Sequence, residues 1–170
     1  QFRNQATVGG SIYGRYGFPD VLTALLAQDS FVELYNGGTI RLSEFVKRKP
    51  DKDILLSIII RKGKRQFRYQ SVRRTKTDFP VIACAVVTGI VHGKESWYIS
   101  VGARPMKAAL LEKHWEIPDD ASEEEIGKYA SEAAAEFTYG TNMRGSADYR
   151  RHLAEVLLRR EISSILAERR

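Results

Sequence analysis

Residues 80–103 read PVIACAVVTGIVHGKESWYISVGA, and their pattern is central to the fold class. The run at 80–91 is apolar and rich in β-branched residues, so it predicts a buried strand. His92-Gly93-Lys94 interrupts this run as a turn, and residues 95–103 predict a second strand. Strands joined by so short a turn pair antiparallel. We therefore predict an antiparallel sheet, to which residues 66–74 (QFRYQSVRR) add a further strand.

Two helices are predicted after this hairpin. Ser122 and Glu125 form a capping box, and apolar residues follow at steps of three and four up to Phe137. Ser146 can cap a second helix that reaches Leu166, with its apolar side chains toward the core and its arginines mainly opposite. The C-terminal part of the chain is thus predicted to be a sheet packed by two long helices.

The N-terminal part predicts a smaller mixed lobe. A short helix follows Pro19-Asp20, and two alternating apolar runs flank the segment 35–38 (YNGG), where Asn-Gly supplies the positive φ angles of a hairpin turn. Residues 53–61 (DILLSIIIR) are dense in isoleucine and leucine and predict a buried strand. The apolar pattern breaks after this run. We predict an α+β fold in two parts, residues 1–63 and residues 64–170.

Composition narrows the classes of function. The 170 residues carry a net charge of +6, but the basic residues form several short runs, which a solvated surface explains better than a nucleic-acid interface. The single cysteine, Cys84, lies in an apolar run, so this chain alone supplies no cysteine cluster for zinc or iron–sulfur binding. No window reaches the length of about 20 apolar residues that a membrane span requires. We expect a soluble, cytoplasmic protein.

The segment Thr7-Val8-Gly9-Gly10-Ser11 suggests a ligand. A glycine pair lets backbone amides approach a phosphate closely, and the flanking hydroxyl groups can donate to the same oxygens. The spacing matches neither a GxGxxG fingerprint nor a Walker loop. Taken alone, the segment is explained equally well by a tight turn.

Several motifs in order resemble the FAD-binding subunit of molybdenum hydroxylases, the xanthine dehydrogenase and carbon monoxide dehydrogenase flavoprotein family. An aspartate that opens a helix ten residues after Gly10 is one of them. The others are RNQATVGGSI (3–12), VELYNGGTIRLSEF (32–45), DILLSIIIR (53–61) and RGSADYRRHLAEVLLRR (144–160). The resemblance implies that FAD lies between two lobes and that a C-terminal domain covers its flavin side.

The resemblance also implies roles for eight residues. Ile54 and Leu55, in an apolar strand, would present backbone atoms to the isoalloxazine edge, and Asp20 would bind toward the dinucleotide. The FAD pyrophosphate would be held mainly by the backbone amides of Ala6, Thr7, Gly9, Gly10 and Ser11.

One lobe of the family's FAD site has no counterpart in these 170 residues. We therefore expect the chain alone to bind FAD weakly or not at all. We also expect the apolar wall that would face the other lobe to favour self-association, because exposed apolar patches tend to become covered. That wall is predicted to include Ile12, Ile54 and Leu55.

The implied partners are an iron–sulfur subunit and a molybdenum-binding subunit. Electrons would pass from molybdopterin through iron–sulfur clusters to FAD, and then to NAD or another acceptor. The flavin carries this redox chemistry, so we predict no catalytic side chain and no metal ligand in this chain. Two alternatives stay open: an assembly fragment that binds no flavin alone, and a basic nucleic-acid-binding module that uses Arg150, Arg151, Arg159 and Arg160.

Overall fold

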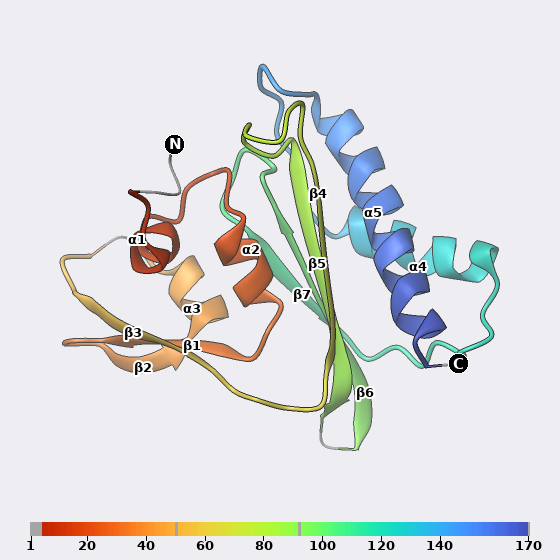
Figure 1. The fold of residues 1–170 in the computed structure, drawn as a ribbon, viewed down its shortest axis with the longest axis horizontal. Coiled ribbons are helices and arrows are strands. Elements are labelled where there is room, and N and C mark those ends of the chain that lie inside the picture. Colours follow the sequence, from red (N-terminus) through yellow and green to blue (C-terminus); the bar gives the residue numbers. More distant parts are fainter. Residues whose placement is uncertain (1–4, 50, 92, 170) are drawn as a thin grey trace.

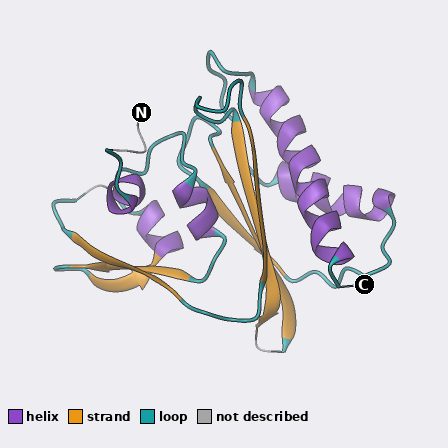
Figure 2. Ribbon diagram, in the orientation of Figure 1, coloured by secondary structure: helices purple, strands orange, loops and turns teal. Residues whose placement is uncertain are grey.

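The computed structural model describes residues 5–49, 51–91 and 93–169, so the predicted turn residue His92 lies outside the described residues. The chain forms four layers (Figure 1): a three-stranded sheet, three short helices, a four-stranded sheet and two long helices. The short helices lie between the two sheets, and the long helices cover the far face of the larger sheet (Figure 2). The predicted α+β class is confirmed.

The small sheet has the strand order β2-β1-β3, and both pairs are antiparallel. The predicted hairpin around residues 35–38 is present, but among its described residues only Gly38 has a positive φ, of 64°. Asn36 and Gly37 therefore do not adopt the conformation that the Asn-Gly pair predicted. The elements of this lobe are α1 Val8–Tyr13, α2 Val21–Leu26, β1 Ser30–Leu34, β2 Gly38–Arg41, α3 Leu42–Lys47 and β3 Leu55–Ile60.

Strand β3 was predicted to be buried, and this prediction is wrong. Among the described residues it pairs only with β1, and it forms an edge of the small sheet. Its inward residues Leu55 and Ile58 pack beside the lobe's core, whereas Leu56 and Ile60 are exposed. A run of isoleucine and leucine is typical of a strand that is covered on both sides, but the run does not reveal whether a neighbouring strand is present.

The large sheet has the antiparallel order β4-β5-β6-β7 and contains the predicted hairpin as β5 and β6. The sequence did not predict β7. Both long helices are present, with the predicted capping box at Ser122 and a side-chain cap from Ser146 to the amide of Tyr149. The elements are β4 Gln66–Val72, β5 Ile82–Val91, β6 Lys94–Gly102, β7 Ala109–Lys113, α4 Glu123–Ala135 and α5 Ala147–Ala167.

The core lies on both faces of the large sheet. Helices α4 and α5 pack on one face around the buried Trp97 and Ile162, and Cys84 is a buried free thiol in this core. Helix α2 approaches the other face so closely that a β-carbon at Gly102 would lie 1.9 Å from Thr23 Oγ1. The two predicted parts therefore pack against each other, and their boundary at residues 63 and 64, in the connection between β3 and β4, stays a prediction.

Candidate functional site

The glycine motif forms the first turn of a helix, not a tight turn. Thr7 is the N-cap of α1, and its Oγ1 accepts a hydrogen bond from Gly10 N at 3.0 Å. Ser11 Oγ donates to the carbonyl of Thr7 at 2.9 Å. Among the described glycines only Gly38 and Gly93 have positive φ angles. The pair Gly9-Gly10 is thus not needed for an unusual backbone conformation. Its effect is that no side chain at these two positions covers the backbone at the helix start.

The start of α1 can accept an anion. A helix leaves its first amides without intrahelical acceptors, and Thr7 Oγ1 accepts from the amide of Gly10, so the amides of Val8 and Gly9 remain without an acceptor among the described residues. The first turn contains no acidic residue, and both Thr7 and Ala6 are exposed. Because the positive end of the helix dipole points to the same place, negative charge is favoured there. Val8 was not among the predicted residues, whereas the amides of the predicted Gly10 and Ser11 are already bonded, to Thr7 Oγ1 and to the carbonyl of Thr7.

The structure brings this helix start beside the beginning of β3. A β-carbon on Gly9 would lie 3.8 Å from Leu55 Cδ2, so two of the predicted segments are neighbours. The side chain of Ile54 is 60% exposed. Its backbone groups are engaged within the lobe, because its N–H donates to Asp53 Oδ1 at 2.8 Å and its carbonyl accepts from Tyr35 N at 2.9 Å.

Asp53 fixes the geometry of this end of the small sheet. Its carboxylate accepts hydrogen bonds from the backbone amides of Asn36, Gly37 and Ile54 at 2.8–2.9 Å. These hydrogen bonds hold the pKa of Asp53 below its usual value, and the bond from the Asn36 amide has the largest effect. Sequence analysis did not single out this carboxylate, which ties the hairpin turn to the start of β3.

One residue of the predicted exposed wall is misplaced. Ile12 is fully buried in the core of the small lobe, so it cannot face a ligand or another chain. Its neighbour in the prediction, Leu55, is partly buried against the same core. The exposed apolar surface of this region instead follows the edge of β3.

Asp20 joins the two parts of the chain. It stands at the N-cap position of α2 but makes no side-chain cap, and its Oδ1 accepts hydrogen bonds from Tyr69 Oη at 2.7 Å and Arg73 Nη2 at 2.5 Å. Burial, and then the bond to Asp20, raise the pKa of the Tyr69 phenol. No described residue bonds to Oδ2, and no hydrogen bond or ion pair joins Asp20 to the segment Thr7–Ser11. The two donors lie about 50 positions away, so the sequence pattern could not identify them.

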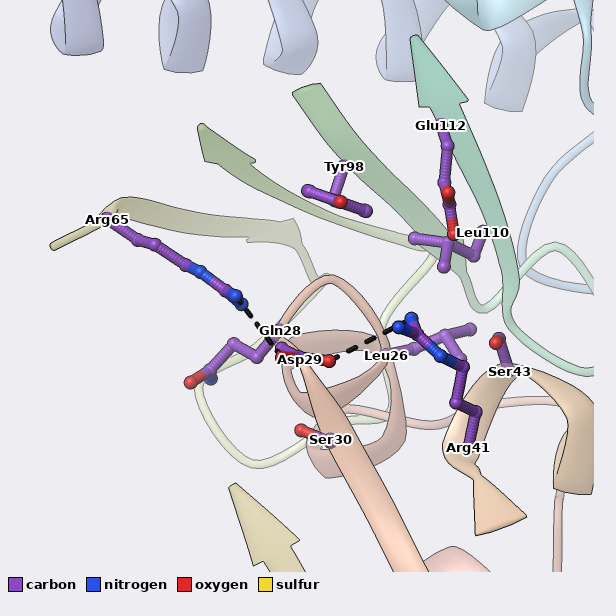
Figure 3. Close-up of a pocket in the computed structure, with 10 residues that line it drawn as sticks. All are labelled: Leu26, Gln28, Asp29, Ser30, Arg41, Ser43, Arg65, Tyr98, Leu110 and Glu112. Atoms are coloured by element: carbon purple, nitrogen blue, oxygen red, sulfur yellow. Dashed lines mark hydrogen bonds and ion pairs between the residues drawn. The ribbon is translucent and has the colours of Figure 1, made fainter. Parts of the chain in front are cut away.

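Two cavities lie away from the predicted residues. One, of about 60 Å³, lies where the small lobe meets the large sheet. Among its lining residues, Asp29 lies between Arg65 and Arg41 (Figure 3), with ion-pair distances of 3.3 Å and 3.8 Å. A neighbouring cavity of about 470 Å³ is lined by Lys47, Arg104 and residues of β7. Neither is lined by any of the eight predicted residues, so neither of these two cavities is the predicted FAD site.

Three further findings bear on the function. Arg150 is only 1% exposed, so it cannot contact a nucleic acid as the basic-module interpretation requires. The described residues contain no group of three or more His, Cys, Asp or Glu side chains arranged to hold a metal ion. Within the same residues, no helix has both the length and the apolar character to cross a membrane.

Comparison with known proteins adds two family matches. Residues 67–165 match the CO dehydrogenase flavoprotein C-terminal domain, and residues 1–62 match the FAD binding domain in molybdopterin dehydrogenase. The "Uncharacterized protein YgfM" of Escherichia coli K12 is 27% identical over 156 residues, which are 92% of this chain and 57% of YgfM.

Solved structures share the fold. Quinoline 2-oxidoreductase from Pseudomonas putida 86 superposes with a TM-score of 0.78 at 17% identity, over 98% of this chain and 62% of that chain. A carbon monoxide dehydrogenase from Hydrogenophaga pseudoflava that lacks the Mo-pyranopterin moiety superposes with a TM-score of 0.73 at 21% identity. The match covers 93% of this chain and 60% of that chain. The chain thus spans less than two thirds of the length of these relatives.

Proposed function

Because the chain belongs to the CO dehydrogenase flavoprotein family, we propose that it is part of the FAD-binding subunit of a molybdenum hydroxylase and supplies one side of the FAD site. The observation that carries this proposal is the bare start of α1, whose free amides lie beside the apolar start of β3. The motif resemblance assigns the pyrophosphate and the flavin edge to these same two segments.

The residues present fit one side of FAD. The amides of Val8 and Gly9 and the hydroxyl proton of Thr7 are available to a pyrophosphate, and Gly9 presents no β-carbon that would hold it away. The exposed Ile54 offers apolar surface to a ring system. Asp20 would accept from a ligand hydroxyl through Oδ2 while Tyr69 and Arg73 hold Oδ1. When bound, FAD supplies the electron-transfer chemistry, and the chain supplies position and surroundings.

The proposed partners are an iron–sulfur subunit and a molybdopterin-binding subunit, with NAD or another carrier as the electron acceptor. Support comes from the family description, which names molybdopterin dehydrogenase, and from the fold shared with carbon monoxide dehydrogenase and quinoline 2-oxidoreductase. A closer relation to xanthine dehydrogenase rests on the motif resemblance alone.

Titration with FAD tests the proposal directly. In a ¹⁵N NMR experiment, we expect the amide resonances of Val8, Gly9 and Ile54 to shift and to saturate only above about 100 µM FAD, because a ligand covered on one side loses much of its burial. Shifts confined to other regions would contradict the proposed site. Saturation at micromolar FAD with 1:1 stoichiometry would show instead that these residues form a complete FAD site.

A second prediction separates ligand binding from folding. Gly9→Ala should raise the free energy of unfolding slightly, by up to about 1 kcal/mol, because alanine favours helix more than glycine does. The same change should weaken FAD binding about tenfold, the equivalent of one lost hydrogen bond to a charged group. Gly127→Ala in α4 is the matched control, since a β-carbon there meets no atom within 4 Å. It should stabilise the fold and leave FAD affinity unchanged; equal affinities in all three proteins would contradict the role of Gly9.

The assembly-fragment alternative predicts a different titration. If the chain serves only to dock on partner subunits, FAD at millimolar concentration should shift no amide resonance of α1 or β3. The burial of Arg150 favours this alternative over a nucleic-acid-binding module, because it removes one of the four arginines that the module requires.

A further inference from the structure

The two sheets have four edge strands, and β3 differs from the other three in charge. Edge strands of soluble proteins commonly carry charged residues, which prevent pairing with other chains. Strand β2 contains Arg41, β4 contains Arg68, and β7 contains Glu112 and Lys113. Strand β3 reads LLSIII and contains neither a charge nor a proline. Its edge is therefore the one that the sequence leaves unprotected.

The backbone of β3 has groups available for pairing. The N–H of Arg61, directly after the strand, donates to the carbonyl of Asp29 at 3.0 Å, so this residue faces β1. Because successive residues of a strand direct their backbone groups to opposite sides, those of Ile58 and Ile60 face away from β1. On that side β3 has no neighbouring strand among the described residues, so these backbone groups are not used in the sheet.

The side chains along this edge are apolar and exposed. Four of them keep between 39% and 60% of their surface in solvent: Ile54, Leu56, Ile59 and Ile60. Because successive side chains of a strand point to opposite faces, Ile59 and Ile60 lie on opposite faces of β3, so exposed apolar side chains flank the unpaired backbone groups on both faces of this edge. An uncharged apolar edge of this kind favours the addition of a further strand.

We propose that β3 pairs antiparallel with β3 of a second copy of this chain. Two copies of an uncharged strand can pair without bringing like charges together. In a twofold-symmetric pair each β3 edge is covered by the other, so no further copy can add to β3. Antiparallel pairing also separates the basic segments RKGKR (61–65) of the two copies, which parallel pairing would bring together. It places each basic segment beside the Asp51 and Asp53 that precede β3 in the partner copy. The result is one continuous sheet of six strands across the two small lobes.

Sedimentation of the 170-residue chain tests the proposal. Because the interface is small, we expect the weight-average mass to rise from 19.3 kDa toward twice that value between about 1 and 100 µM protein. Leu56→Lys should keep the chain monomeric over this range. Ile90→Lys is the matched control: Ile90 is 71% exposed, against 55% for Leu56, and it lies on β5 of the other sheet. This variant should associate like the parent.

Hydrogen exchange of the parent chain provides an independent measurement. The amides of Ile58 and Ile60 should become protected as the protein concentration rises, whereas the amide of Arg61, already bonded to Asp29, should be protected at every concentration. A monomer at all concentrations, or a dimer that persists in Leu56→Lys, would overturn the proposal. Protection of Ile58 and Ile60 in a monomer would also overturn it, by showing that another segment of the same chain covers this edge.

Discussion

Replacement of Arg150 by lysine is expected to lower the free energy of unfolding by about 3–4 kcal/mol. The guanidinium of Arg150 is buried and donates to four acceptors: the carbonyls of Val81, Gly140 and Gly145 and the side-chain oxygen of Asn142. These acceptors belong to the start of β5 and to the loop between α4 and α5. Arg150 therefore fixes this loop against the large sheet.

Lysine preserves the charge but cannot replace this arrangement. Its ammonium group is a compact charge without the planar fork of a guanidinium, so it cannot reach acceptors on both sides of the loop at once. Buried carbonyls would lose their donors, and each unsatisfied group costs about 1–3 kcal/mol. Burial also lowers the pKa of Arg150, and no carboxylate is among the acceptors that hold its charge.

Urea denaturation of two variants measures the effect. Arg151→Lys is the matched control, because Arg151 is the next residue of α5 and is exposed. Its free energy of unfolding should stay within about 0.5 kcal/mol of the parent. If Arg150→Lys were as stable as Arg151→Lys, the hydrogen bonds of Arg150 would not be needed to hold the loop.

The elements that the sequence predicted well are those whose signals are local. The capping box at Ser122 and the apolar steps of three and four predicted α4, and the short turn after residues 80–91 predicted the β5–β6 hairpin. Each of these features depends on residues within a few positions of one another. The boundaries of the two long helices agree with the predicted ranges to within two residues.

The errors arose where a distant segment decides the outcome. Strand β3 lies at the edge of its sheet, with no strand on its second side in the part of the chain that the structure describes, and the apolar run 53–61 looks the same in either case. Helix α1 was missed because two adjacent glycines disfavour a helix, although the cap from Thr7 starts one there. For the candidate site, the sequence placed the glycine motif and Leu55 in neighbouring segments but gave no sign that Asp20 bonds to Tyr69 and Arg73.

Glu161 is another residue whose setting depends on distant contacts. Spacing alone places it on α5 between the core residues Leu158 and Ile162, yet an ionisable side chain is usually expected at the surface. In the structure it is fully buried against β4 and β5, and neither carboxylate oxygen has a described partner with full hydrogen-bond geometry. Burial raises the pKa of Glu161 to about 8; the nearby backbone of Gln70, which lacks that geometry, and the charge of Arg68 lower it only weakly.

A raised carboxyl pKa makes stability fall with increasing pH. Between the usual glutamate value of 4.5 and a folded value of about 8, the folded chain binds the proton that the unfolded chain releases. This contribution to the free energy of unfolding is therefore fully present below pH 4.5 and is lost as the pH rises through about 8. At about 1.4 kcal/mol for each pKa unit, the loss amounts to roughly 4–5 kcal/mol.

Glu161→Gln is accordingly expected to be about as stable as the parent at pH 5 and more stable by several kcal/mol at pH 9. Glutamine has nearly the same shape as protonated glutamate but cannot ionise, so the buried site never has to hold a negative charge. The measurement is urea denaturation of parent and variant at both pH values. The matched control is Glu155→Gln, a partly exposed carboxylate on the same helix, whose difference between pH 5 and pH 9 should equal that of the parent. A Glu161→Gln variant that loses as much stability as the parent between these pH values would mean that Glu161 does not titrate in the buried position, and the pH dependence would then have to come from other groups.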